Sequence, residues 1–163
     1  MSPNDREGDV LKKLDLRVKE IMRPNPPTVP ASATVLEAAK VMEKQDSSFV
    51  FVKSKKGIVG VVTERDITRR VVGKGASPAA TKVETVMTSP MIVVSPEAKV
   101  EDALNVMASK KVRMLPVMDD KAGLAGLVSV SDIAKALAEK SGYTSSLITA
   151  MTKENPPRSG IYG

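Results

Sequence analysis

The chain has 163 residues, of which 42% are apolar and 27% are charged, and its formal net charge is +6. It contains no cysteine, which excludes disulfides, thiolate nucleophiles and cysteine metal sites. It also contains no histidine, so most hydrolytic and metal-dependent chemistries are hard to build. Its apolar runs are much shorter than the ~18 residues of a membrane span, and its polar start lacks the apolar segment of a secretory signal. We therefore expect a cytoplasmic protein without a membrane partner.

The first half of the chain predicts a strand and then a helix. Residues 1–15 are expected to form a tail and a short helix, and the proline-rich residues 24–27 lead into an extended segment over residues 28–30. Thr34 and Glu37 have the spacing of a capping box, in which a hydroxyl and a carboxylate satisfy free amides at a helix start. The spacing of apolar residues behind them predicts a helix to about residue 45.

A hairpin and a second helix complete this half. Two apolar runs, residues 49–52 and 58–62, flank a charged turn and predict a pair of strands. Thr63 follows the second run and Asp66 comes three residues later, so we expect Thr63 to cap a helix that ends near Gly73.

The second half of the chain repeats the first. The segment from Gly57 to Ile67 matches the segment from Gly123 to Ile133, with Thr63 and Asp66 in the places of Ser129 and Asp132. Further matches lie upstream, pairing Met22 with Met87, Val35 with Val100, Ala38 with Ala103, Met42 with Met107 and Val52 with Val117. Two copies of one supersecondary unit therefore explain the chain.

The repeat predicts the organisation of the whole chain. We expect repeat 1 over residues 16–75, a linker over 76–82, repeat 2 over 83–140 and a C-terminal tail over 141–163. Repeat 2 should contain an extended strand at 92–94, a helix over 100–108, strands at 114–118 and 124–128, and a helix capped by Ser129.

Asp66 and Asp132 are candidates for binding a sugar. One ionised carboxylate can accept hydrogen bonds from both neighbouring hydroxyls of a ribose, and a bond to a charged group contributes about 1.5–3 kcal/mol. The hydroxyls of Thr63 and Ser129, with the free amides of the two helix starts, suit a phosphate. The same four residues are good helix caps in a protein that has no ligand, so the residues alone leave both interpretations open.

Each half of the chain resembles a cystathionine-β-synthase (CBS) domain, and the pair resembles a Bateman module. The resemblance is carried by the doubled pattern of glycine, apolar residues, Thr or Ser and then Asp, by the openings at residues 20–22 and 86–88, and by the strand at 112–117. It implies an α+β fold of two β-α-β-β-α repeats packed with pseudo-two-fold symmetry, and a homodimer that forms a flat disc. It also implies clefts for adenosyl ligands such as AMP, ADP, ATP, S-adenosylmethionine or NAD.

By the same resemblance, each cleft combines the aspartate of one repeat with the strands of the other. The first cleft would consist of Thr63, Asp66, Ile92, Val93, Arg113, Met114 and Pro116, and Arg65 would add positive charge beside it or be solvated. The second would consist of Ser129, Asp132, Thr28, Val29, Ser48, Phe49 and Val50. Arg113 offers a guanidinium for phosphate where the equivalent Ser48 is uncharged, so we expect AMP to bind more tightly in the first cleft.

These observations favour a binding module over an enzyme. We expect no catalytic residue, no metal and no required cofactor, with AMP as the regulatory ligand and an unknown protein effector as the partner. Two alternatives stay open: a nucleic-acid-associated protein that uses its basic face, and a structural dimerisation scaffold. The first has little support for base stacking, because the chain contains two Phe, two Tyr and no Trp.

Overall fold

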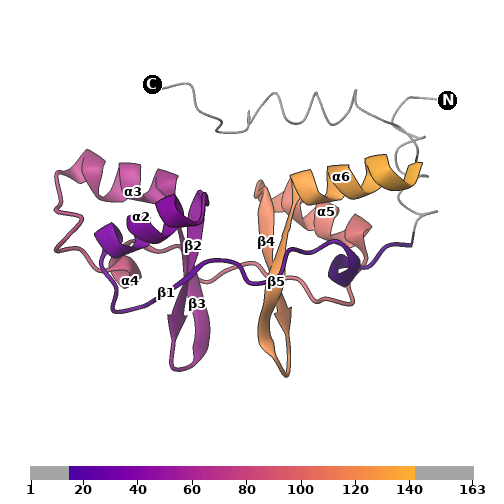
Figure 1. Ribbon diagram of the computed structural model, residues 1–163, viewed down its shortest axis with the longest axis horizontal. Coiled ribbons are helices and arrows are strands. Elements are labelled where there is room, and N and C mark those ends of the chain that lie inside the picture. The colour runs from indigo at the N-terminus through magenta and orange to yellow at the C-terminus, as the bar shows by residue number, and fades with distance from the viewer. Residues whose placement is uncertain (1–14, 142–163) are drawn as a thin grey trace. The chain divides into compact units, whose positions relative to one another are not determined.

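The computed structural model describes residues 15–141, which divide into two compact units (Figure 1). The Asp66 unit contains residues 24–93 and the hairpin tip 118–126, and the Asp132 unit contains residues 15–23, 94–117 and 127–141. The units therefore do not follow the sequence repeats, because residues 83–93 lie with repeat 1 and residues 15–23 lie with repeat 2. The helix predicted near residues 10–14 and the tail from residue 142 lie outside the described residues.

The Asp66 unit is built on a three-stranded sheet in the order β1-β2-β3. Strand β1 (Thr28–Pro30) runs parallel to β2 (Phe49–Ser54), and β2 pairs antiparallel with β3 (Gly57–Thr63), with Phe49 opposite Thr63. The strands are longer than predicted, because residues 53 and 54 still pair with β3 and only residues 55–56 turn. Gly57 follows this turn with φ +104°, a conformation that favours glycine.

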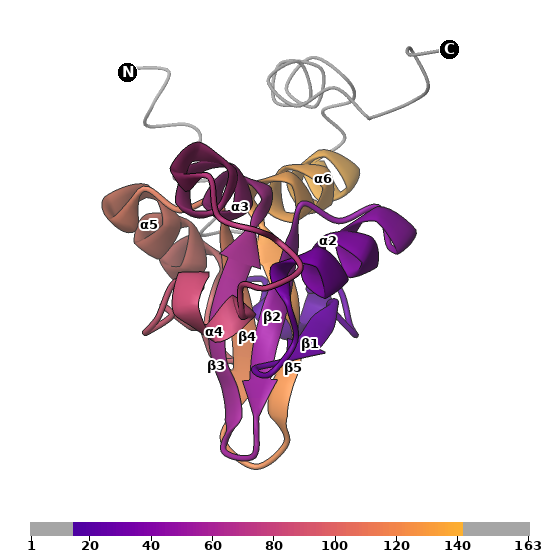
Figure 2. The ribbon, with the colours of Figure 1, turned by 90° about the vertical axis from the view of Figure 1, so that its left-hand side faces the viewer.

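Four helical segments accompany this sheet, namely α2 (Val35–Lys44), α3 (Glu64–Arg70), the 3-10 turn η2 (Val72–Lys74) and α4 (Val83–Val86). Figure 2 shows α2 and α4 in front of the strands. The buried core joins side chains from α2, α4 and all three strands: Val29, Ala33, Val35, Ala38, Met42, Val50, Val52, Val62, Val71, Val83 and Val86. Helix α3 ends at Arg70 rather than near Gly73, because the chain tightens into η2 and closes at Gly75 with φ +66°.

The capping box predicted for α2 is confirmed. The Thr34 hydroxyl accepts a hydrogen bond from the Glu37 amide at 3.2 Å, and Glu37 Oε2 accepts one from the Thr34 amide at 2.6 Å. The bond from the Thr34 backbone amide, together with one from its hydroxyl, holds the pKa of the Glu37 carboxyl below its ordinary value. The carboxylate form of Glu37 is therefore the form that caps the helix.

Because the folded-state pKa of Glu37 is lowered, this cap stabilises the protein above the ordinary pKa of 4.5 and is lost as the pH falls through the folded value. We expect Glu37→Gln to lower the urea midpoint at neutral pH. In acid, where the parent's carboxyl is protonated, the difference between parent and variant should shrink. Urea titrations of both proteins at about pH 7 and at about pH 3 test this. An equal difference at both pH values would contradict the role of the ionised cap.

The Asp132 unit contains two longer helices and the β4–β5 hairpin without its tip. Figure 1 shows these elements. Helix α5 (Val100–Lys110) precedes β4 (Met114–Asp119), and β5 (Gly123–Ser129) leads directly into α6 (Val130–Ser141). A 3-10 turn, η1 (Val18–Glu20), precedes residue 24. The strand predicted at 92–94 is reduced to one parallel bridge, between Val94 and Val117.

Each unit contains a short segment from the repeat that supplies the other unit's aspartate. We call residues 16–23 and 83–88 the lead-ins. The amide of Val83 donates to the carbonyl of Ala33 at 2.9 Å, and the amide of Val18 donates to the carbonyl of Ala98 at the same distance. Val18 and Val83 are equivalent in the repeat, and so are the two alanines. The two repeats therefore exchange equivalent segments.

The end of each lead-in pairs with the last strand of its unit. Thr88 exchanges two backbone hydrogen bonds with Val61 of β3, at 2.8 and 3.1 Å, and Arg23 does the same with Leu127 of β5, at 2.8 and 2.9 Å. Gly60 makes this approach possible, since a Cβ there would lie 2.5 Å from the Met87 sulfur and 3.0 Å from the Thr88 carbonyl oxygen.

Candidate ligand-binding site

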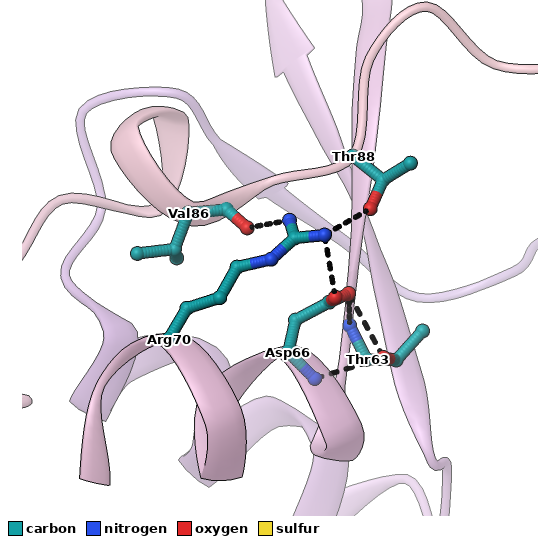
Figure 3. Close-up of polar contacts among 5 residues, drawn as sticks. All are labelled: Thr63, Asp66, Arg70, Val86 and Thr88. Atoms are coloured by element: carbon teal, nitrogen blue, oxygen red, sulfur yellow. Dashed lines mark hydrogen bonds and ion pairs between the residues drawn. The ribbon is translucent and has the colours of Figure 1, made fainter. Parts of the chain in front are cut away.

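In the Asp66 unit, the site lies where β3 ends and α3 begins (Figure 3). The Thr63 hydroxyl accepts a hydrogen bond from the Asp66 amide at 3.2 Å. In return, Asp66 Oδ2 accepts bonds from the Thr63 amide at 2.9 Å and from the Thr63 hydroxyl at 2.8 Å. Asp66 is only 9% exposed. Its Oδ2 atom is thus occupied by the helix cap.

In the Asp132 unit, the junction of β5 and α6 repeats this geometry. Asp132 Oδ2 accepts from the Ser129 amide at 2.8 Å and from the Ser129 hydroxyl at 2.6 Å, and the Asp132 amide donates to that hydroxyl at 3.2 Å. The helix start also contacts the residue before β4, because the Val130 amide donates to the carbonyl of Arg113 at 3.0 Å. The equivalent bond of the Asp66 unit runs from the Glu64 amide to the carbonyl of Ser48, also at 3.0 Å.

An arginine contacts each aspartate, and sequence reasoning did not single out either one. Arg70 Nη2 lies 3.2 Å from Asp66 Oδ1 (Figure 3). Arg23 Nε lies 3.0 Å from Asp132 Oδ1. Arg70 follows Asp66 by one helical turn, a spacing that could have indicated the pair. Arg23 is 109 residues from Asp132, and no local pattern joins them.

The other predicted residues of the Asp66 unit differ in what they can offer a ligand. The side chains of Val29 and Val50 are buried in the hydrophobic core, so only their backbone groups are available for recognition. Phe49 is also buried, whereas Ile92 and Val93 are 38% and 48% exposed. The remaining three, Thr28, Ser48 and Arg65, are exposed.

On the predicted strand of the Asp132 unit, Arg113 is exposed, Met114 is half-buried and Pro116 is buried. The predicted pairing of Asp66 with Arg113, and of Asp132 with Ser48, joins residues of different units. It stays a prediction.

A cavity of about 610 Å³ lies elsewhere in the Asp66 unit. It is lined by Thr28, Val29, Pro30, Ala31, Ser32, Lys53, Ser54, Lys55 and Glu84. Of the predicted site residues it includes Thr28 and Val29 but neither Thr63 nor Asp66. Residues 53–55 are at the turn end of β2, while Phe49 at the other end pairs with Thr63. The cavity and the capping aspartate are therefore separate features.

Two features are absent from the part of the chain that the structure describes. Over residues 15–141, no cluster of three acidic, cysteine or histidine side chains is arranged to hold a metal ion. Over the same residues, no helix has the length and apolar character to cross a membrane.

Comparison with known proteins identifies the repeat. The family model of the CBS domain matches twice, over residues 18–73 and 83–139. The chain belongs to the CBS domain family. Its two tandem CBS domains form a regulatory pair, and the α+β fold of two β-α-β-β-α repeats is confirmed.

The CBS pair has relatives among curated proteins and solved structures. It is 36% identical over 112 residues to the CBS domain-containing protein CBSX3, mitochondrial, of Arabidopsis thaliana, which covers 66% of this chain. The chain spans only about half, 54%, of that relative's length. A protein with CBS domains from Burkholderia ambifaria MC40-6 is 32% identical, with a TM-score of 0.70 over 76% of this chain and 95% of the other.

A second similar structure was solved with ligands. It is the CBS domain pair of protein MJ0100 in complex with 5-methylthioadenosine and S-adenosyl-L-methionine. It superposes with a TM-score of 0.67 over 77% of this chain and 98% of that one, at 24% identity. This likeness establishes the common fold alone.

Proposed function

We propose that this CBS pair is a non-catalytic sensor that binds an adenosyl ligand, AMP first among them, and signals to a partner protein by a conformational change. The observation that carries the proposal is the doubled cap: two aspartates, each one turn into a helix, with one carboxylate oxygen directed away from the cap. Such an oxygen can accept a ribose hydroxyl, and the adjoining helix starts favour negative charge. The ligands of the MJ0100 pair support the choice of an adenosyl compound.

The ligand is proposed to lie in clefts that combine the aspartate of one repeat with the strands of the other, as the family resemblance implies. Arg113 then favours a phosphorylated ligand beside Asp66, and a less charged adenosyl compound is preferred beside Asp132. A cytoplasmic homodimer and a separate effector protein complete the proposal. Two other functions, nucleic-acid binding through the basic surface and dimerisation without a ligand, remain as alternatives.

The direct test is isothermal titration with AMP, ATP, S-adenosylmethionine and NAD. Asp66→Asn and Asp132→Asn keep an oxygen for the helix cap but replace the outer acceptor with a donor. We expect each substitution to weaken binding at its own site by about tenfold or more, because hydrogen bonds to a charged group are lost.

Asp102→Asn is the matched control, since Asp102 lies in the first turn of α5, where no hydroxyl caps the helix. If the parent protein binds none of the four compounds, the sensor proposal is wrong. A titration with single-stranded and double-stranded nucleic acid at two salt concentrations would then separate the two alternatives.

A further inference from the structure

Each site aspartate has one carboxylate oxygen bonded to the helix cap and one covered by an arginine. Oδ2 of Asp66 accepts two bonds from Thr63, and Oδ1 lies 3.2 Å from Arg70 Nη2 (Figure 3). Oδ2 of Asp132 accepts two bonds from Ser129, and Arg23 Nε lies 3.0 Å from Oδ1 while it also donates to Oδ2 at 3.2 Å. A carboxylate offers about four lone-pair sites, so the cap leaves two on the outer oxygen, and an arginine nitrogen lies within ion-pair distance of that oxygen in each unit.

A ribose that binds through both hydroxyls needs two acceptor sites. Only the outer oxygen can supply them, since the cap uses the inner one. The two hydroxyls and the arginine therefore require the same oxygen. We infer that Arg70 and Arg23 compete with the ligand for Asp66 and Asp132, and that they compete with unequal strength. This inference rests on the proposed adenosyl-binding function and adds the residues that decide which aspartate is more accessible.

The two arginines come from positions that are not equivalent in the repeat. Arg23 aligns with Thr88, because each follows an equivalent methionine and each pairs with the last strand of its unit. Arg70 aligns with Ala136, four residues after Asp132. Each unit thus has one guanidinium at its aspartate, although neither arginine has an arginine at the equivalent position of the other repeat. The two contacts are separate features of the two units, so they need not be equally strong.

Arg70 is held by more acceptors than Arg23. Its Nη1 donates to the carbonyl of Val86 at 2.6 Å, and its Nη2 donates to the Thr88 hydroxyl at 3.2 Å (Figure 3). Arg23 contacts both oxygens of Asp132 through Nε, and within residues 15–141 the structure gives its guanidinium no partner residue besides Asp132. The side chain of Arg23 is also the more exposed, at 57% against 42%. A ligand therefore displaces Arg23 from Asp132 more easily than it displaces Arg70 from Asp66.

The test uses adenosine, which has the ribose but no charge, so the loss of a positive charge does not itself weaken attraction to the ligand. Arg70→Gln is measured in an Asp132→Asn background, and Arg23→Gln in an Asp66→Asn background, so that each titration reports one aspartate. We expect adenosine to bind about two- to fivefold more tightly after Arg23→Gln, the range that an exposed ion pair accounts for. The gain after Arg70→Gln should be larger. Arg69→Gln changes the same charge on α3 without a contact to Asp66 and should change nothing.

Each outcome decides the inference. Weaker or unchanged adenosine binding after both arginine substitutions overturns it while the sensor function stands, because the arginines would then contact the ligand or be neutral. A larger gain from Arg23→Gln than from Arg70→Gln overturns the order of strength. If neither the parent nor any variant binds an adenosyl compound, the proposed function and this inference are both wrong.

Discussion

A fragment of residues 24–93 is expected to fold, whereas a fragment of residues 16–75, which is the first repeat as the sequence divides it, is expected to remain unfolded. The shorter fragment lacks α4, whose Val83 and Val86 are 0% and 6% exposed in the core of the Asp66 unit. Full burial of a valine contributes about 1.5–3 kcal/mol, so these two account for much of the ~5–15 kcal/mol that stabilises a typical domain. The fragment 24–93 keeps the whole cluster and omits only the hairpin tip 118–126.

Thermal melts followed by circular dichroism, with amide dispersion in an NMR spectrum, would distinguish the two fragments. A control of the same length is the fragment 24–93 with Val83→Asp and Val86→Asp. These substitutions should abolish its cooperative melt. A cooperative transition in the fragment 16–75 would show that the lead-in is dispensable, and our account of the core would then be incorrect.

Gly60→Val is expected to destabilise the full-length protein by about 3 kcal/mol, although valine is a far better strand residue than glycine. The reason is the approach of the lead-in to β3. A Cβ at this position would lie 2.5 Å from the Met87 sulfur, 2.9 Å from Met87 Cγ and 3.0 Å from the Thr88 carbonyl oxygen. The methionine can rotate away, but the Thr88 backbone is tied to Val61 by two hydrogen bonds. The urea midpoint of unfolding measures the effect.

A double-mutant cycle with Met87→Ala separates the clash from other effects. Met87→Ala alone removes a half-buried side chain and should also destabilise. In the double variant the smaller side chain relieves part of the overlap, so the combined loss should be less than the sum of the two single losses. Strictly additive losses would mean that residue 60 and Met87 do not clash.

Local chemistry made most of the elements predictable. The Thr34 and Glu37 box placed the start of α2 because a hydroxyl and a carboxylate three residues apart satisfy amides at any helix start. The apolar runs placed both hairpins, although β2 continues through Lys53 and Ser54, whose polar character favoured a turn. Polar residues at the end of a strand can pair without being buried, and composition does not distinguish them from a loop.

Three features could not be read from the sequence, because they depend on which segments meet in space. The exchange of lead-ins is invisible in a duplicated chain, since either lead-in matches the sequence of either repeat. The end of α3 at Arg70 follows from the tightening into η2 rather than from Gly73. The contact of Arg23 with Asp132 requires the pairing of Arg23 with Leu127, which joins residues more than a hundred positions apart.

The exchange of lead-ins also determines what the covalent linker contributes. A protease that cut the chain once within residues 76–82 would leave residues 83–88 on β3 and residues 16–23 on β5. The two products would then remain associated through two separate sets of backbone hydrogen bonds and buried valines, one set in each unit. By the same geometry, two copies of a chain with a single repeat could complete one another by trading lead-ins. The tandem chain is thus a covalently linked equivalent of a segment-swapped dimer.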